Sequence, residues 1–169
     1  LAPIGACRTC LVEADGRVIA ACSIPAASVR EVQTTTDRVR RLRRGVLELT
    51  AGMQRERLSG GPVSTHTADT ITREAADRSR FILETNEHRD SSNSFFTFDE
   101  AACILCGRCV VACQALQHIS AIGMAGSGRT TRVTPGADLS FRDSICTSCG
   151  SCVAACPTTA LAPKMEVNP

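Results

Sequence analysis

Apolar residues recur three and four positions apart in the first half of the chain, which is the spacing of one face of an α-helix. This face consists of Val39, Leu42, Val46, Leu49 and Met53. The predicted helix lies between Asp37, a suitable N-cap, and Gly60–Gly61, a suitable stop. The same stretch carries five arginines, which we expect to form its solvated face: Arg38, Arg40, Arg41, Arg43 and Arg44.

Shorter patterns predict a hairpin, a linker and a turn. The apolar pairs 11–12 and 18–19 flank Asp15-Gly16, which predicts a β-hairpin with a two-residue turn. Residues 84–94 (ETNEHRDSSNS) have neither helical nor strand periodicity and are predicted to be a linker. The glycine-rich stretch 123–129 (GMAGSGR) lacks the GK[ST] ending of a phosphate loop, and a surface turn is the better prediction.

Composition excludes two classes of protein and raises a question about the core. No apolar run approaches the roughly 18 residues of a membrane span, so the chain is not membrane-embedded. Its net charge of +2 is far from the basic balance of a dedicated nucleic-acid binder, and no nucleic-acid partner is expected. The 169 residues include no Trp, no Tyr and only five Phe, but 11 Cys. A hydrophobic core with so few aromatic residues must consist of small aliphatic side chains or of something that is not protein.

Eight of the cysteines form two runs with the same spacing, C-x2-C-x2-C-x3-C. The runs cover 103–113 and 146–156 and repeat at an interval of 43 residues, with Pro157 directly after the second. Gly107 and Gly150 match between them, which indicates an internal duplication. This is the spacing of bacterial two-cluster ferredoxins, where three cysteines of one run and the fourth of the other hold each [4Fe–4S] cluster.

Steric reasons explain why the fourth cysteine serves the other cluster. Three thiolates two residues apart can surround one corner of a cluster only from a tight loop, which glycine allows. The fourth cysteine follows one helical turn after the third and therefore points away from its own loop. We assign Cys103, Cys106, Cys109 and Cys156 to cluster one, and Cys146, Cys149, Cys152 and Cys113 to cluster two. Phe95, Phe96 and Phe98 are expected to shield one cluster from water.

Two other uses of these cysteines are possible. Zinc sites usually contain two C-x2-C pairs or Cys/His mixtures, and a third evenly spaced cysteine is not typical of them. A disulfide scaffold would need oxidising surroundings, and C-x2-C runs pair poorly within themselves.

Three further cysteines lie around the predicted hairpin. Cys7 and Cys10 precede it and Cys22 follows it. A [2Fe–2S] cluster needs four ligands, so one is missing. Because the sequence begins at Leu1 rather than Met, we expect the chain to be a fragment and the fourth ligand to lie upstream. The alternative is three buried or reactive thiols.

Several motifs together resemble one iron–sulfur module. They are G-x-C-R-x-C-x-V-E (5–13), VLEL (46–49), SSNSFFTFD (91–99), CILCGRCVVAC (103–113) and CPTTAL (156–161). The module forms the N-terminal part of molybdenum- or tungsten-dependent formate dehydrogenase catalytic subunits. It also occurs in the large iron–sulfur subunit of respiratory complex I, in the diaphorase iron–sulfur subunit of NAD-reducing hydrogenases and in some [FeFe]-hydrogenases. The formate dehydrogenase type is the most similar.

This resemblance implies further details of the sites. A plant-ferredoxin-like fold would hold [2Fe–2S], with Cys7, Cys10 and Cys22 as the last three of its four ligands. Family members usually carry H-x3-C-x2-C-x5-C between the two ferredoxin-like parts, and this motif binds another [4Fe–4S] cluster. Aligned on His66, the cysteine positions are occupied here by other residues, namely Thr70, Arg73 and Ser79. We expect this middle site to have lost its cluster.

The predicted fold is α+β with three parts and a tail. A [2Fe–2S] ferredoxin-like domain lacking its N-terminal part (1–35) precedes a helical connector with the degenerate site (36–98). A two-[4Fe–4S] ferredoxin domain (99–163) and a tail (164–169) follow. The expected cofactors are two [4Fe–4S] clusters, and one [2Fe–2S] cluster if the upstream cysteine is present. No catalytic residue and no metal other than cluster iron is predicted, so the chain should be a carrier subunit or domain.

The predicted function is electron transfer within an NAD(P)-linked oxidoreductase, first of the formate dehydrogenase type. The expected partners are a catalytic subunit or domain (a molybdenum or tungsten formate dehydrogenase, or a hydrogenase) and a flavin-containing, NAD(P)H-linked subunit. An NAD-reducing hydrogenase or a complex-I-like enzyme is the alternative. A redox-sensing protein and a zinc-stabilised interaction module are more remote alternatives. The resemblance and the free thiolate ligands imply a cytoplasmic protein.

Overall fold

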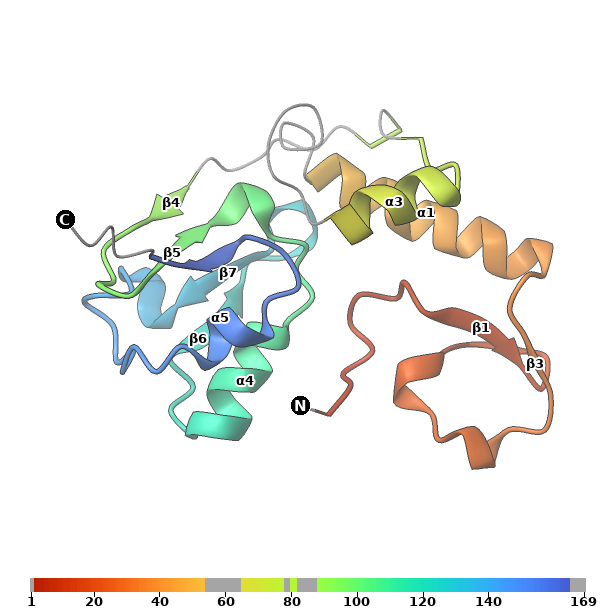
Figure 1. The fold of residues 1–169 in the computed structure, drawn as a ribbon, viewed down its shortest axis with the longest axis horizontal. Helices are drawn as coiled ribbons and strands as arrows, with labels where there is room; N and C mark the ends of the chain where they lie inside the picture. The colour runs from red at the N-terminus through yellow and green to blue at the C-terminus, as the bar shows by residue number, and fades with distance from the viewer. Residues whose placement is uncertain (1, 54–64, 78–79, 82–87, 165–169) are drawn as a thin grey trace.

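Three small antiparallel sheets and four α-helices make up the described part of the computed structural model, which covers residues 2–53, 65–77, 80–81 and 88–164. Figure 1 shows an N-terminal sheet on one side, two helices above it, and a C-terminal domain on the other side. The N-terminus lies between the first sheet and the C-terminal domain. Among the described helices, none has the length and apolar character that a membrane span requires.

The N-terminal sheet contains the predicted hairpin. β1 (Leu11–Ala14) pairs with β2 (Arg17–Ala20) on one edge and with β3 (Val32–Gln33) on the other. The two turn residues, Asp15 and Gly16, have φ values of 47° and 74°. A type I′ turn requires positive φ at both central positions, which explains the Asp-Gly pair. The Asp15 carboxylate also accepts backbone N–H groups of residues 30 and 31, and so holds the chain that enters β3.

Helix α1 (Asp37–Met53) forms as predicted, but its cap differs from the prediction. The hydroxyl of Thr36, not the carboxylate of Asp37, accepts the backbone N–H of Val39 at 3.2 Å. Asp37 is the first helical residue, where its charge favours the positive end of the helix dipole. The predicted stop at Gly60–Gly61 lies outside the described residues.

The buried face of α1 is shifted from the predicted one. Val39, Leu47 and Ala51 are buried, whereas Leu42 and Leu49 are 41% and 45% exposed. Arg43 lies on the buried side rather than on the solvated face. It donates to the carbonyl oxygens of Leu11 (3.0 Å) and Thr34, and it pairs with Glu74 at 3.4 Å. This one arginine therefore joins α1 to the N-terminal sheet, while the other four are exposed as expected.

Helix α3 (Thr65–Arg73) packs against α1 through Ile71, which contacts the buried Leu47 and Ala51. A buried carboxylate strengthens this pairing. Glu48 is only 3% exposed, yet it pairs with Arg80 at 2.6 Å and accepts the backbone N–H of Asp77 at 3.3 Å. A buried charge without such partners would be strongly destabilising, so these contacts fix the segment that follows α3.

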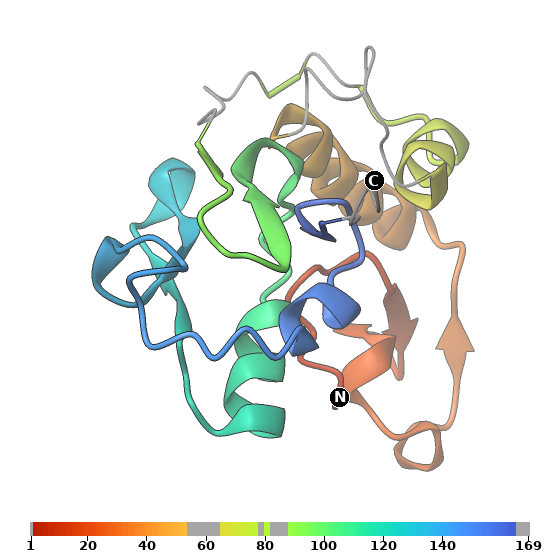
Figure 2. The same ribbon diagram turned by 60° about the vertical axis from the view of Figure 1, so that its left-hand side comes forward.

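The C-terminal domain joins its two ends in one sheet. β5 (Phe96–Asp99) lies between β4 (Arg89–Asp90) and β8 (Leu161–Pro163), all antiparallel. Between β5 and β8 the chain forms helix α4 (Arg108–Gln117), the hairpin of β6 (Ile122–Ala125) and β7 (Arg132–Pro135), and the short helix α5 (Ser151–Ala155). Helices α4 and α5 pack against each other (Figure 2). The glycine-rich stretch 123–129 lies in the β6–β7 hairpin, at the surface.

Cysteines and phenylalanines form the core of this domain. Phe96 and Phe98 are buried and contact Phe141 edge-on, with ring centroids 5.1 and 5.9 Å apart. Phe95 is 63% exposed, because neighbouring residues of an extended chain point to opposite faces. The prediction that all three phenylalanines of this segment shield a cluster is therefore wrong for Phe95. Cys109, Cys113 and Cys152 belong to the same core.

The polar stretch predicted to be a linker is part of the folded domain. Residues 89–90 form β4, and Asp90 and Asn93 are buried; residues 84–87 lie outside the description. The Asp90 carboxylate accepts the backbone N–H groups of Ser92 and Phe141, both at 2.7 Å. Although burial opposes ionisation, hydrogen bonds with the Ser92 side chain and with these two backbone groups lower the pKa of Asp90. The polar residues here satisfy backbone groups inside the protein.

Candidate metal centres

Two small cavities in the C-terminal domain are each lined by four cysteines. Cavity one is lined by Cys103, Cys106, Cys109 and Cys156. Cavity two is lined by Cys113, Cys146, Cys149 and Cys152. In each case three cysteines come from one run and the fourth from the other. These are the sets that the spacing assigns to clusters one and two, and their role as ligands stays a prediction.

The duplicated sequence folds into two loops with the same backbone. Gly107 and Gly150 precede α4 and α5 with φ values of 72° and 77°. Leu105 and Ser148 also have positive φ, 51° and 58°, which costs a residue with a side chain about 1 kcal/mol or more. Such strain persists where the surroundings require it, and it is common at functional sites.

This strained geometry directs backbone N–H groups at sulfur. The N–H of Leu105 donates to Cys103 Sγ, and that of Ser148 to Cys146 Sγ, both at 3.4 Å. The N–H of Ala121 donates to Cys113 Sγ at 3.2 Å. Hydrogen bonds to ligand sulfurs are one of the factors that set the potential of an iron–sulfur cluster.

Three of these cysteines, Cys103, Cys109 and Cys152, would be neutral thiols without a bound cation. Burial, and then the neighbouring thiols, raise the pKa of Cys103 to about 11 and that of Cys109 to about 12. The same causes raise the pKa of Cys152 to about 12. Four thiolates this close together need nearby positive charge, and a coordinated metal deprotonates a thiol outright. The donor sets therefore fit iron clusters.

Cys149 differs from the others because it is exposed. Its slight burial opposes ionisation, but hydrogen bonding with Ser151 and Thr147 lowers the pKa of Cys149. Its counterpart in the first run, Cys106, is half-buried and its pKa is raised by burial.

Apolar side chains complete the walls of both cavities. Cavity one contacts Phe98, Val133 and Leu161. Cavity two contacts Phe96 and Ile122. Apolar walls exclude water from a cluster, which also helps to set its potential. Phe96 and Phe98 therefore line different cavities, so the prediction that they shield the same cluster is wrong.

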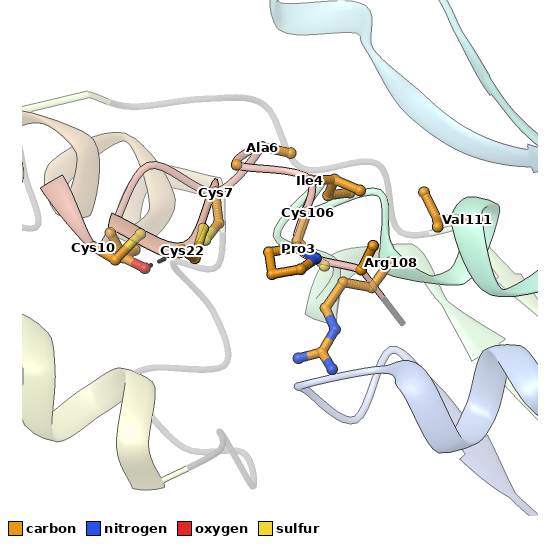
Figure 3. Close-up of a pocket in the computed structure, with 12 residues that line it drawn as sticks. Pro3, Ile4, Ala6, Cys7, Cys10, Cys22, Cys106, Arg108 and Val111 are labelled. Carbon is orange, nitrogen blue, oxygen red and sulfur yellow. Dashed lines mark hydrogen bonds between the residues drawn. The ribbon is translucent and has the colours of Figure 1, made fainter. Parts of the chain in front are cut away.

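The N-terminal cysteines line a third cavity of about 320 Å³ (Figure 3). Cys7, Cys10 and Cys22 come together there, and Cys106 of the C-terminal domain lines the same space. The hydrogen bond between Cys10 and Cys22 raises the pKa of Cys22. Burial opposes the ionisation of Cys10, but hydrogen bonding with Cys22 lowers the pKa of Cys10. Cys106 already belongs to the set around cavity one, so the structure gathers three cysteines for the N-terminal site.

The middle site lies on and after α3. His66, Thr70 and Arg73 are in this helix, and Ser79 lies outside the described residues.

Across the described part of the chain, no three or more His, Cys, Asp or Glu side chains converge as closely as a single metal ion requires. All eleven cysteines have free thiols.

Comparisons with known proteins match both the duplicated runs and the whole fold. The model of the 4Fe-4S dicluster domain family matches residues 102–160. A solved NAD+-reducing [NiFe]-hydrogenase in the H2-reduced state aligns with a TM-score of 0.80 and 26% identity, over 98% of this chain and 72% of that chain. The chain is an iron–sulfur electron-transfer module.

The chain is also similar to two staphylococcal proteins over part of their length. The "Putative formate dehydrogenase" of Staphylococcus haemolyticus (strain JCSC1435) is 30% identical over 122 residues, and that of Staphylococcus aureus (strain USA300) is 29% identical. Each alignment covers 69% of this chain and 12% of the relative. The module therefore spans about an eighth of the length of these relatives.

Sequence analysis missed three residues that shape the sites of the iron–sulfur module. Leu105 and Ser148 adopt the left-handed conformation without being glycine, so no residue type signalled it. Asn93 donates to Ser148 Oγ at 2.8 Å and accepts the N–H of Phe95 at 2.9 Å. Its position in SSNS, just before an aromatic strand, was the available signal for an Asx turn.

Proposed function

We propose that this module carries two [4Fe–4S] clusters, in a ferredoxin domain spanning residues 99–163. Cys103, Cys106, Cys109 and Cys156 would hold cluster one; Cys146, Cys149, Cys152 and Cys113 would hold cluster two. The observation that carries the proposal is the grouping of these cysteines, four around each of two apolar cavities. When bound, each cluster supplies a one-electron carrier.

The surrounding residues have definite roles in this proposal. Leu105, Ser148 and Ala121 donate N–H groups to sulfur and so stabilise negative charge there. Phe96 and Phe98 keep water away from the cavities. These contacts suit two bound clusters that carry electrons. None of these residues is proposed to bind or convert a substrate.

For the N-terminal unit, residues 1–35, we propose a [2Fe–2S] site with Cys7, Cys10 and Cys22 as ligands and a fourth ligand upstream. Their convergence on one cavity supports this. Cys106 lines both this cavity and cavity one, which makes the two sites neighbours. The connector between this unit and the C-terminal domain would then have a middle site that binds no cluster.

The host enzyme is proposed to be an NAD(P)-linked oxidoreductase of the formate dehydrogenase type. The similarity to the staphylococcal proteins over 122 residues supports this choice. An NAD-reducing hydrogenase is the second candidate, because that structure matches nearly the whole chain. The partners would be a catalytic domain or subunit on one side and a flavin-containing subunit on the other. A cytoplasmic location fits ligands that must stay reduced.

Iron and sulfide analysis of the anaerobically purified chain tests the cofactor content. Two [4Fe–4S] clusters give about 8 irons per chain, and a [2Fe–2S] cluster raises this to about 10 if the fourth ligand is present. Zinc analysis of the same sample is the control, and visible absorption should show the broad brown band of iron–sulfur proteins. A value near 12 irons would mean that the middle site binds a cluster; a colourless zinc protein would refute the proposal.

A further inference from the structure

Asn93 joins the segment before β5 to the loop that carries three cysteines of cavity two. It is only 4% exposed. Its Oδ1 atom accepts the backbone N–H of Phe95 at 2.9 Å, and its Nδ2 atom donates to Ser148 Oγ at 2.8 Å. The two atoms cannot exchange places, because the N–H of Phe95 needs an acceptor and an NH2 group is none. A buried amide that is hydrogen-bonded at both ends holds its partners in one arrangement.

The partner of this amide, Ser148, has a backbone conformation that is unfavourable for a residue with a side chain. Its φ is 58°, in the left-handed region. In this conformation its backbone N–H donates to Cys146 Sγ at 3.4 Å. A strained residue keeps such a conformation where its surroundings require it. The hydrogen bond from Asn93 is a contact that can hold Ser148, and with it the N–H group, in place.

The equivalent residue of the first cysteine run is held in a different way. Leu105 lies 43 residues before Ser148 in the duplicated sequence. It also has a positive φ, 51°, and it donates its N–H to Cys103 Sγ at the same distance, 3.4 Å. Its side chain packs against the hydrophobic core of the C-terminal domain. A serine side chain is too short and too polar to pack in this way, so the hydrogen bond from Asn93 takes the place of packing.

We propose that Asn93 is a positioning residue for cluster two, which acts through Ser148 to hold an N–H group against Cys146 Sγ and so raises the reduction potential of that cluster. The inference rests on the proposed function. Reduction adds negative charge to a cluster and its sulfurs, and a hydrogen-bond donor at sulfur stabilises that charge. Weakening the hold on this donor should therefore lower the potential of cluster two. Cluster one, whose donor belongs to Leu105, should not respond.

An anaerobic redox titration of the full chain, followed by electron paramagnetic resonance, tests this role. The signal that Cys113→Ala abolishes is that of cluster two. At the wild-type midpoint potential of cluster two, Asn93→Ala and Ser148→Ala should each lower its ratio of reduced to oxidised form by about threefold. This is less than the full value of one hydrogen bond, because the bond exists in both redox states. The double variant should show no further decrease, since both changes break the same contact. The midpoint of cluster one should not change.

Ser92→Ala is the matched control. Ser92 lies next to Asn93, and its hydroxyl accepts the backbone N–H of Arg142 at 3.1 Å. This variant therefore also loses a contact between the two segments, but it keeps the one to Ser148. The potential of cluster two should stay at its wild-type value. An equal decrease in Ser92→Ala would mean that any loosening of this segment lowers the potential, and it would overturn the proposal.

Two further results would also overturn it. One is an unchanged potential of cluster two in Ser148→Ala, a variant that keeps the backbone N–H; it decides the question even where Asn93→Ala does not retain its clusters. The other is a further decrease in the double variant. Iron analysis of the same samples separates this inference from the proposed function. About 8 irons per chain with unchanged potentials contradicts the role of Asn93 alone, whereas a wild-type chain without iron contradicts the proposed function as well.

Discussion

Removal of iron and sulfide from the anaerobic chain should unfold its C-terminal domain, from β4 to β8. Cys109, Cys113 and Cys152 belong to the core of this domain, which otherwise contains three phenylalanines and small aliphatic side chains. The binding energy of a structural metal site is also folding energy, and for zinc sites it reaches about 10 kcal/mol or more. Without the clusters, the domain should lose its cooperative melt.

Thermal melts followed by circular dichroism measure this effect. Untreated chain kept anaerobic is the control, and it should melt cooperatively. Chelation should abolish the transition of the C-terminal domain. A native-like cooperative melt of cluster-free protein would show that the polypeptide holds the domain together without iron.

The substitution Cys113→Ala should remove cluster two and spare cluster one. Cys113 lies on α4, in the first run, yet it lines the cavity of the second run. The iron content should therefore fall by about 4 per chain. Electron paramagnetic resonance should lose the signal of the cluster held by Cys146, Cys149 and Cys152.

The matched variant is Cys156→Ala, since Cys156 lines cavity one although it belongs to the second run. It should remove the other signal. If Cys113→Ala instead eliminated the cluster of Cys103, Cys106 and Cys109, each run would bind its own cluster. The ferredoxin arrangement would then be wrong.

Local patterns predicted those parts of the fold whose geometry depends on a few neighbouring residues. The turn at Asp15-Gly16 requires two positive φ angles, and this residue pair adopts them readily. The cysteine spacing indicated both the duplication and the groupings around the two cavities, because the fourth cysteine must point away from its own loop.

Features that depend on tertiary contacts could not be predicted in this way. Arg43 was expected in solvent, but carbonyl groups of the N-terminal sheet compensate its burial. Asp90 and Asn93 were expected in a linker, but they are buried because Asp90 accepts the N–H of Phe141 and Asn93 donates to Ser148 Oγ. The partners of such polar residues lie on other segments, and periodicity carries no information about them.

The proposed electron-transfer function is tested most directly by measuring electron transfer from the purified module to its partner. Reduced with dithionite and freed of excess reductant, the chain should pass electrons to the flavin-containing subunit of its enzyme. Chain without clusters is the control and should pass none. Because no substrate site is proposed in this chain, it should not turn over formate, hydrogen or NADH by itself. Reduction of the flavin by the loaded chain, without turnover of any of the three, is the predicted result. Turnover of one of them by the isolated chain, or no electron transfer to the flavin, would contradict the account.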